Sequence, residues 1–426
     1  MRRIVWGALA LAACVGAGLA GPQLPSAAAP QDVGFDSSKL KLLDAAMDKA
    51  VDSGEVAGIE IMAVRHGRIA DLHLHGLASI AAKTPIARDT IFRMYSQTKP
   101  MIGVAMMILY EEGKWKLDDP VTKFIPEFAN LKVLTSSGGL EDMKHPPTMR
   151  ELVTHTAGFG YGLATGNAVD DAFREKKVLQ SNGLQEMIDR IATIPLLYQP
   201  GTKWSYSAAV DIQGYIIEKL SGETLGHFMH DRVWGPLGMD DTGFIVPAQN
   251  AARLSGVYVK NQMTGNKLFE LTTAMPYIQD FTKPPPIESG GGGSVSTVDD
   301  YALFCQMLLN KGELNGVRIL KPESVAMMET DQLEPSIVAP TGVASEAVRF
   351  GVDVAISAKP AMWGARQSAG SFWWGGAAGT WFWVDPKNDL FFLGMIQRFG
   401  TGTMGSESIG PASQTLLYDA LTHPEK

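Results

Sequence analysis

The chain has 426 residues, of which 45% are hydrophobic and 19% are charged. It can therefore bury a sizeable core, which excludes an intrinsically disordered chain, and it has room for one large domain or two ordinary ones. The net charge of −8 offers no basic field, so we expect no nucleic-acid partner. Two cysteines are too few for a disulfide framework or a thiolate zinc site.

The first thirty residues have the pattern of an export signal. Arg2 and Arg3 precede an uncharged apolar stretch over residues 4–20, and small residues follow at 26–29. We expect a signal peptide over residues 1–28, cleaved after Ala28, and hence a periplasmic or secreted protein.

Two alternatives to cleavage at this point stay open. The apolar run could remain as a membrane anchor, although it is short for a span. The sequence Leu11-Ala12-Ala13-Cys14 is also similar to a bacterial lipoprotein box. We therefore expect no stable membrane partner unless Cys14 is lipidated.

The predicted elements begin with a helix that starts at Asp36-Ser37-Ser38 and stops at Gly54. Two strand-like runs, GIEIMAV and RIADLHLHG, then meet at His66-Gly67 and predict a hairpin. The stretch from Pro100 to Tyr110 is apolar on all sides, which predicts a buried helix.

The middle of the chain mixes short helices with loops, and the end returns to strands. Helices are expected over 148–153, 185–194, 208–220 and 299–310, with a glycine-rich turn at 289–293 before the last of them. The strand patterns near the C-terminus are VRFGVDVAI, SFWWGG, TWFWVD and LFFLGMIQ. Strands at both ends with helices between them predict one sheet built from both termini, with a helical insertion.

Common catalytic and metal motifs are missing. The chain contains no G-x-S-x-G elbow, which argues against the α/β-hydrolase fold, and no HExxH. His73 and His75 could form half of a ligand set, but no third ligand has a persuasive spacing to them. We expect two hairpin-packed histidines, no metal and no cofactor.

The S-x-x-K pattern occurs twice, and the surroundings separate the two copies. Ser38 opens an amphipathic surface helix, where a serine caps the helix end. Ser96, in contrast, lies between a strand-like run and the apolar helix, close to unsatisfied backbone N–H groups and the positive helix end. Lys99 falls on the same helix face, and loss of solvation there favours its neutral, basic form. The alternative is a capping serine beside a snorkelling lysine.

Two further segments favour a catalytic interpretation. Tyr206-Ser207-Ala208 opens a helix with a regular apolar stripe. Trp374-Gly375-Gly376 lies in a glycine-rich strand, where backbone can approach a ligand closely.

With these segments the chain resembles the serine hydrolases of the class C β-lactamase and penicillin-binding-protein type, and most closely the family VIII carboxylesterases. The matching blocks run in family order over nearly the whole chain after residue 35, and include FRMYSQTKP, MRELVTHTAGF, WSYSAAVDIQGYIIEKLSG, GGGGSVSTVDDYALF and WWGGAAGTWFWVDPKNDL. The resemblance implies an α/β (α+β) fold of the β-lactamase/transpeptidase type. Residues 29–426 would form one catalytic domain, with an α/β lobe over about 32–95 and 290–426 and a mostly helical lobe over about 96–289.

The resemblance also implies roles for individual residues. Ser96 matches the acylated nucleophile, Lys99 its motif partner, and Tyr206 the tyrosine that relays the serine proton. The backbone N–H groups of Ser96 and Ala377 would form the oxyanion hole. The remaining residues expected to contact the substrate are Trp374, Gly375, Gly376, Tyr161 and Phe159, although the aromatic ones among them could equally be packing residues.

Two departures from the lactamase pattern favour ester substrates. Trp374 stands where lactamases of this fold carry a lysine that holds the substrate carboxylate, and Ala208 replaces the usual asparagine of the second motif. Arg398 is a possible substitute clamp. We therefore expect a serine carboxylesterase for small, neutral esters. The alternatives are a β-lactamase or D-Ala-D-Ala carboxypeptidase on the same machinery, and a catalytically silent sensor. The sequence leaves the oligomeric state open.

Overall fold

The computed structural model describes residues 22–261, 265–275, 278–400 and 409–424. Its centre is an eight-stranded antiparallel sheet in the order β12-β13-β14-β15-β16-β1-β2-β3. The strands are β1 Gly58–Arg65, β2 Arg68–Ser79, β3 Thr84–Pro85, β12 Val348–Phe350, β13 Ala355–Ser357, β14 Phe372–Gly375, β15 Trp381–Asp385 and β16 Leu390–Met395. β1 pairs with β16, so both ends of the chain build one sheet, as predicted.

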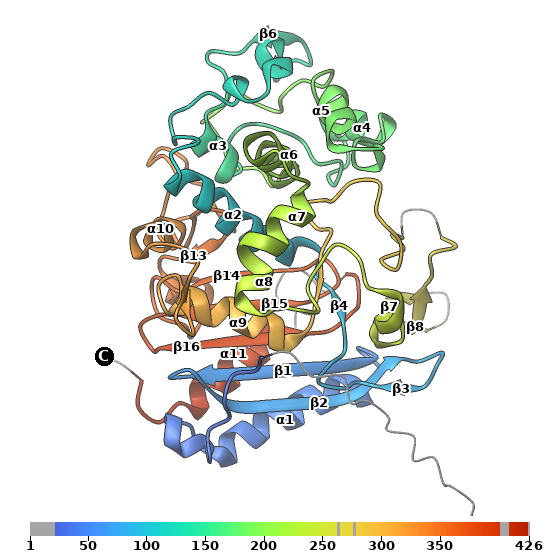
Figure 1. Ribbon diagram of the computed structural model, residues 1–426, viewed down its shortest axis with the longest axis vertical. Helices are drawn as coiled ribbons and strands as arrows, with labels where there is room; N and C mark the ends of the chain where they lie inside the picture. The colour runs from blue at the N-terminus through green and yellow to red at the C-terminus, as the bar shows by residue number, and fades with distance from the viewer. Residues whose placement is uncertain (1–21, 262–264, 276–277, 401–408, 425–426) are drawn as a thin grey trace, which may run out of the picture.

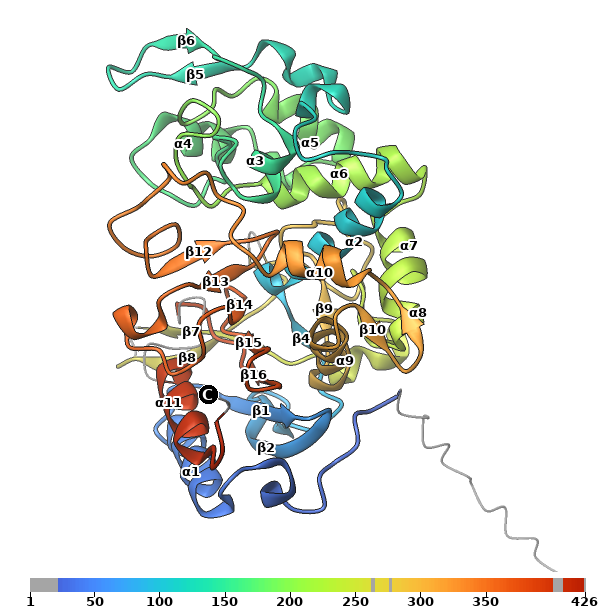
Figure 2. The same ribbon diagram turned by 90° about the vertical axis from the view of Figure 1, so that its left-hand side faces the viewer.

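Helices cover the sheet and form a second lobe above it (Figure 1). α1 (Ser37–Asp52) and α11 (Ile409–Ala420) pack together on one face, while α9 (Val298–Leu309) packs on β1, β15 and β16. The other helices are α2 Lys99–Glu111, α3 Met149–Val153, α4 Ala168–Glu175, α5 Leu184–Ile191, α6 Ala209–Ser221, α7 Leu225–Met229, α8 Gly235–Leu237 and α10 Pro322–Met328. Figure 2 shows the helical lobe with α3 to α6 beyond the β12 end of the sheet, which agrees with the predicted helical insertion.

Four short two-stranded ribbons accompany the large sheet among the described residues. Their strands are β4 Phe92–Arg93 with β9 Val295–Ser296, β5 Lys132–Leu134 with β6 Leu140–Asp142, β7 Val257–Asn261 with β8 Lys267–Leu271, and β10 Glu313–Leu314 with β11 Val317–Arg318. The β4–β9 ribbon joins the segment before α2 to the segment that follows the glycine-rich turn at 289–293.

The strand pattern VRFGVDVAI needs a correction, because it forms a hairpin and not one strand. β12 and β13 pair with each other across residues 351–354. Asp353 adopts a left-handed φ of 56°, and its N–H donates to the Val153 carbonyl at 3.2 Å. Gly351 is needed in this turn, since a Cβ there would lie 1.9 Å from the Met328 carbonyl oxygen.

His73 and His75 project from β2 toward α1, as hairpin-packed histidines would. His73 Nε2 lies 2.7 Å from Asp48 Oδ1, and His75 Nε2 lies 2.9 Å from Asp52 Oδ1. Each imidazole therefore pairs with its own carboxylate of α1, and these two carboxylates lie one helical turn apart.

Asp71, on the same strand, makes stability depend on pH. Burial, aided by the neighbouring Asp44 carboxylate, raises the pKa of Asp71 to about 7, against about 3.9 in an unfolded chain. The folded state therefore holds a proton that the unfolded state releases, and stability falls as pH rises from about 4 to 7. We expect Asp71→Asn to raise the melting temperature by about 2 °C or more at pH 8 and to change it little at pH 4.

Thermal melts at the two pH values test this expectation. Asp48→Asn is the control, because it breaks ion pairs to His73 and His75 and should not stabilise the protein at pH 8. An Asp71→Asn effect of equal size at both pH values would contradict the role given to the carboxyl proton.

The predicted export signal lies mostly outside the described residues. Of the described part, Leu24 is buried and Ser26 forms a bridge with Ile69 of β2. The Ala27 N–H also donates to the Ile69 carbonyl at 2.9 Å. A cut after Ala28 would remove these contacts, and the boundary stays a prediction.

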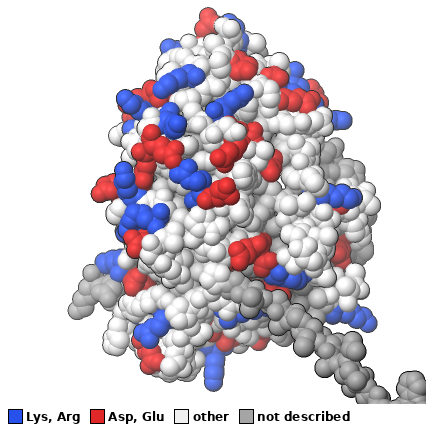
Figure 3. Space-filling model, in the orientation of Figure 1, with Lys and Arg blue, Asp and Glu red and all other residues white. Residues whose placement is uncertain are grey.

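Two further features of the described chain are the spread of its charged side chains and the character of its helices. On the face of Figure 3, basic and acidic side chains are interspersed, and neither kind gathers into an extended patch. Within the described ranges no helix is both long enough and apolar enough to cross a bilayer.

Candidate active site

Ser96 lies in a short 3₁₀ turn, Tyr95–Thr98, between β4 and α2. This is the strand–helix junction expected from the sequence, although the strand is only two residues long. Tyr95 has a left-handed φ of 46°, which is strained for a bulky side chain. Its ring packs on Phe399 with centroids 5.1 Å apart, which helps to hold the turn.

Lys99 lies directly beneath this serine and is fully buried. Its Nζ is 3.3 Å from Ser96 Oγ, 3.2 Å from Tyr161 Oη and 2.5 Å from the Gly291 carbonyl oxygen. The ammonium or amine group therefore has three oxygen neighbours in fixed directions, one of which is the predicted nucleophile.

Tyr206 comes from the other side of the serine, just before α6. Its Oη is 2.6 Å from Ser96 Oγ, and Lys99 Nζ lies 4.6 Å from the centre of its ring. The structure thus brings Ser96, Lys99 and Tyr206 together, although 110 residues separate the serine from the tyrosine. A hydroxyl with two proton-accepting groups in reach has the arrangement that nucleophilic catalysis requires.

The Trp374-Gly375-Gly376 segment lies beside the same turn. The Trp374 ring is buried, and its centre is 5.6 Å from that of Tyr206. A Cβ on Gly376 would lie 2.3 Å from the Met94 carbonyl oxygen, so only glycine allows this close approach to the segment before Ser96. Ala377 follows in a tight turn in which the Gly376 N–H donates to the Thr380 carbonyl. Its role as an oxyanion donor stays a prediction.

Two predicted pocket residues have different environments. Phe159 is buried, and its ring packs on Phe128 with centroids 5.2 Å apart, which fits the packing alternative. Tyr161 does more than form a wall, because its hydroxyl contacts Lys99. Arg398 was the candidate carboxylate clamp. Its Nη2 lies 3.7 Å from Glu55 Oε1, so the negative charge of Glu55 balances the positive charge of the arginine.

His155, which was not predicted as a site residue, packs against Tyr206. The imidazole lies against the Tyr206 ring at 5.1 Å, and its Nδ1 accepts the Ser207 N–H at 3.2 Å. Burial, aided by the positive charge of Lys99, lowers the pKa of His155 well below its usual value. The ring is therefore neutral at pH 7 and holds the second-motif segment in place. The only sequence signal was a histidine within MRELVTHTAGF.

Asp211 and Gly291 were also missed as site residues. Asp211 is a single acid in the apolar first turn of α6, and Gly291 lies in the predicted glycine-rich turn at 289–293, for which no role was expected. A buried carboxylate in an apolar helix is costly unless it is paired, so Asp211 was the detectable signal.

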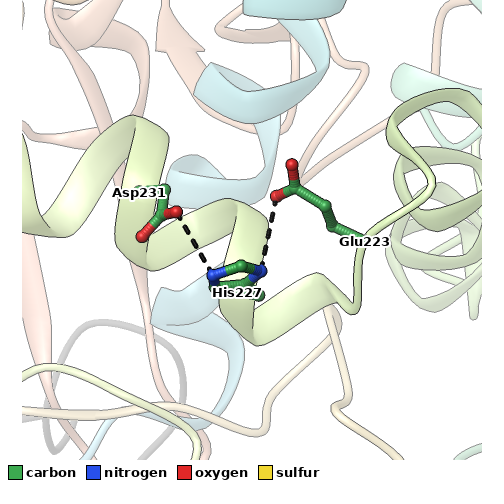
Figure 4. A group of neighbouring side chains, drawn as sticks. All are labelled: Glu223, His227 and Asp231. Atoms are coloured by element: carbon green, nitrogen blue, oxygen red, sulfur yellow. Dashed lines mark ion pairs between the residues drawn. The ribbon is translucent and has the colours of Figure 1, made fainter.

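A cluster away from these residues brings together one histidine and two carboxylates. Figure 4 shows His227 between Glu223 and Asp231, all three exposed. His227 Nδ1 is 3.7 Å from Glu223 Oε2, and its Nε2 is 3.2 Å from Asp231 Oδ2. The carboxylates thus pair with opposite nitrogens of the ring, one from the loop before α7 and the other one turn further along the chain, which is an ion-pair arrangement at i, i+4 spacings.

Comparisons with known proteins agree with this geometry. The Beta-lactamase family model matches residues 43–409, so the chain belongs to this family. Protein Rv1367c of Mycobacterium tuberculosis is 34% identical over 83% of this chain and 89% of its own length. Esterase EstB of Burkholderia gladioli is 30% identical over 89% of this chain and 96% of its own length.

A solved structure shows the same fold. EstCE1, described as a hydrolase with promiscuous acyltransferase activity, is similar with a TM-score of 0.76 and 25% identity, over 89% of this chain and 98% of its own. The predicted β-lactamase-like fold and the kinship with serine hydrolases of this type are confirmed. Together the relatives support a serine ester hydrolase of the β-lactamase fold.

Proposed function

We propose that this protein is an exported serine carboxylesterase that hydrolyses short-chain, neutral esters through an acyl-enzyme on Ser96. The observation that carries the proposal is the position of Ser96 Oγ, 3.3 Å from Lys99 Nζ and 2.6 Å from Tyr206 Oη. The similarity to EstB and EstCE1 supports the same class of reaction.

The reaction would proceed in two steps at one serine. Ser96 Oγ bonds to the ester carbonyl carbon while its proton passes to the Lys99/Tyr206 pair. The same proton goes to the alcohol oxygen as the C–O bond breaks. A water molecule then repeats the sequence on the acyl-enzyme, and the acid leaves as Ser96 regains its proton. The N–H groups of Ser96 and Ala377 would stabilise the oxyanion in both steps.

The preference for neutral esters rests on Trp374. A lysine in its place would offer a carboxylate a charge-assisted hydrogen bond, typically worth about 1.5–3 kcal/mol. Its absence corresponds to a loss of roughly 10- to 100-fold in kcat/KM for an anionic β-lactam. The buried indole, packed between the rings of Tyr206 and Phe350, gives an apolar wall that a neutral acyl group can use.

We therefore expect p-nitrophenyl butyrate to be a far better substrate than nitrocefin, with short acyl chains from acetate to hexanoate preferred. Trp374→Lys should reduce the difference in kcat/KM between the two substrates, because it should weaken ester turnover and improve lactam turnover. Measuring kcat/KM for both substrates on one preparation tests this. Equal or better turnover of nitrocefin would favour the lactamase alternative.

The silent-sensor alternative is tested separately with a fluorophosphonate probe. An active hydrolase should be labelled covalently at Ser96, and labelling should follow ester hydrolysis across variants. A protein that neither reacts with the probe nor hydrolyses esters would overturn the proposal.

A further inference from the structure

The glycine-rich turn at 289–293 lies next to the nucleophile because the β4–β9 ribbon joins their segments. The Met94 N–H donates to the Ser294 carbonyl at 2.9 Å, and Thr98 Oγ1 lies 2.7 Å from Ser294 Oγ. This pairing directs the Gly291 carbonyl oxygen toward Lys99 Nζ, 2.5 Å away. The turn therefore supplies one of the three oxygen neighbours of the lysine.

Asp211 holds this turn from the side of α6. The carboxylate is fully buried, and its Oδ1 accepts the Ser289 hydroxyl at 2.5 Å and the Gly291 N–H at 3.0 Å. Its Oδ2 is also buried and makes no hydrogen bond within ordinary limits to the described residues. One oxygen thus fixes the turn, and the other is left to act on a neighbour.

That neighbour is the Tyr161 hydroxyl. A Cβ on Gly291 would lie 2.3 Å from Asp211 Oδ2 and 2.5 Å from Tyr161 Oη. Both oxygens therefore lie close to the point where a side chain of residue 291 would begin. Burial, and then the Asp211 carboxylate beside it, raise the pKa of Tyr161 well above its usual value. Tyr161 therefore keeps its proton. Two acceptors face its hydroxyl: the Gly291 carbonyl, which is 3.4 Å away and already accepts from Lys99, and the Asp211 carboxylate, whose charge attracts the proton more strongly.

The orientation of this proton decides what Lys99 can do. In the form that accepts the serine proton, Lys99 is an amine with two N–H donors and one lone pair. The Gly291 carbonyl takes one donor. Tyr161 Oη, with its own proton directed to Asp211, acts as an acceptor and takes the other at 3.2 Å. The lone pair is then left for the third neighbour, the Ser96 hydroxyl at 3.3 Å.

We propose that Asp211 is a positioning residue which fixes Tyr161 as a hydrogen-bond acceptor and so aims the Lys99 lone pair at Ser96. This inference rests on the proposed function, since it concerns activation of the same serine. It assigns the glycine-rich turn and the tyrosine to orientation of the base. Asp211 itself touches neither the substrate nor the reacting atoms.

Asp211→Asn is the test, because the amide oxygen can still accept from Ser289 and Gly291 while the NH₂ group becomes a donor toward Tyr161. The tyrosine proton would then turn toward Lys99 and compete with it. We expect kcat for p-nitrophenyl butyrate to fall by about 100-fold, as small misorientations typically cost, with KM within about threefold. The rate of fluorophosphonate labelling should fall in parallel.

Tyr161→Phe gives a second reading that a purely structural role would not reproduce. Because Asp211 acts through Tyr161, the double variant should be about as slow as Tyr161→Phe alone. Multiplicative losses, or a wild-type kcat in Asp211→Asn, would overturn the inference. Tyr161→Phe also keeps the test decisive if Asp211→Asn fails to fold, since it must lower kcat by itself.

Asp353→Asn is the matched control. This buried carboxyl accepts from Gln213 Nε2 at 3.1 Å, and burial raises its pKa to about 8, so the amide mimics its neutral form at pH 7. We expect kcat within about threefold of the wild type. An equal fall in both Asn variants would overturn the inference in favour of general core damage. A wild-type protein that is not labelled at Ser96 would instead overturn the proposed function.

Discussion

Ser96→Ala is expected to abolish ester hydrolysis, with kcat/KM falling by about 10⁴-fold or more, because it removes the hydroxyl that contacts both Lys99 Nζ and Tyr206 Oη. The fold should survive, since the change removes one oxygen at a junction held by the β4–β9 ribbon and by α2. Ester kinetics and a thermal melt on the purified variant measure both expectations.

Ser38→Ala is the matched control for this prediction, because Ser38 belongs to the other S-x-x-K pattern. Its hydroxyl donates to the Asp36 carboxylate at 2.6 Å on the exposed end of α1. The rate should stay almost unchanged. Covalent labelling of Ser38, or of any serine other than Ser96, would refute the assignment of the nucleophile.

Lys99 and Tyr206 are expected to act as one unit in moving the serine proton. Lys99→Met, which keeps most of the buried volume, and Tyr206→Phe should each lower kcat by about 10²- to 10⁴-fold. The double variant should be little worse than the poorer single variant, because either loss already interrupts the same proton path. Steady-state kinetics on the three variants test this.

Two outcomes would contradict the coupled pair. Near-wild-type activity in Tyr206→Phe would remove the tyrosine hydroxyl from the mechanism, in spite of its 2.6 Å contact with Ser96 Oγ. Fully multiplicative losses in the double variant would mean that the two groups serve separate steps. Unchanged melting temperatures in the single variants are needed to exclude loss of packing around α6.

Local patterns in the sequence were enough for the elements and for part of the site. α1 begins within the predicted start Asp36-Ser37-Ser38, although its cap is Asp36 and not Ser38, and the hairpin turns at His66-Gly67. Ser96 and Lys99 share a helical face because three residues separate them, a spacing that any helix start converts into proximity. These features depend on near neighbours along the chain, so short stretches of sequence determine them.

Other features were decided only by contacts between distant segments. VRFGVDVAI has the alternation of one strand, yet it folds into a hairpin, in whose turn Gly351 passes closely by a carbonyl of another segment. Phe159 looks like a pocket residue beside Tyr161 in sequence, but the packing of the helical lobe buries it against Phe128.

The surroundings of Lys99 show most clearly which features the sequence predicts and which only the tertiary structure reveals. The sequence identified Lys99 through its spacing from Ser96, and Tyr206 through family resemblance. It did not identify the Gly291 carbonyl, which lies 192 residues from Lys99 and carries no side chain. Every residue has a backbone carbonyl, so the sequence cannot indicate which one contacts Lys99. A buried carboxylate such as Asp211 finds its partners only when α6 packs against the glycine-rich turn. Residue type and spacing therefore determined which groups carry the chemistry, while the tertiary structure decided how they are oriented.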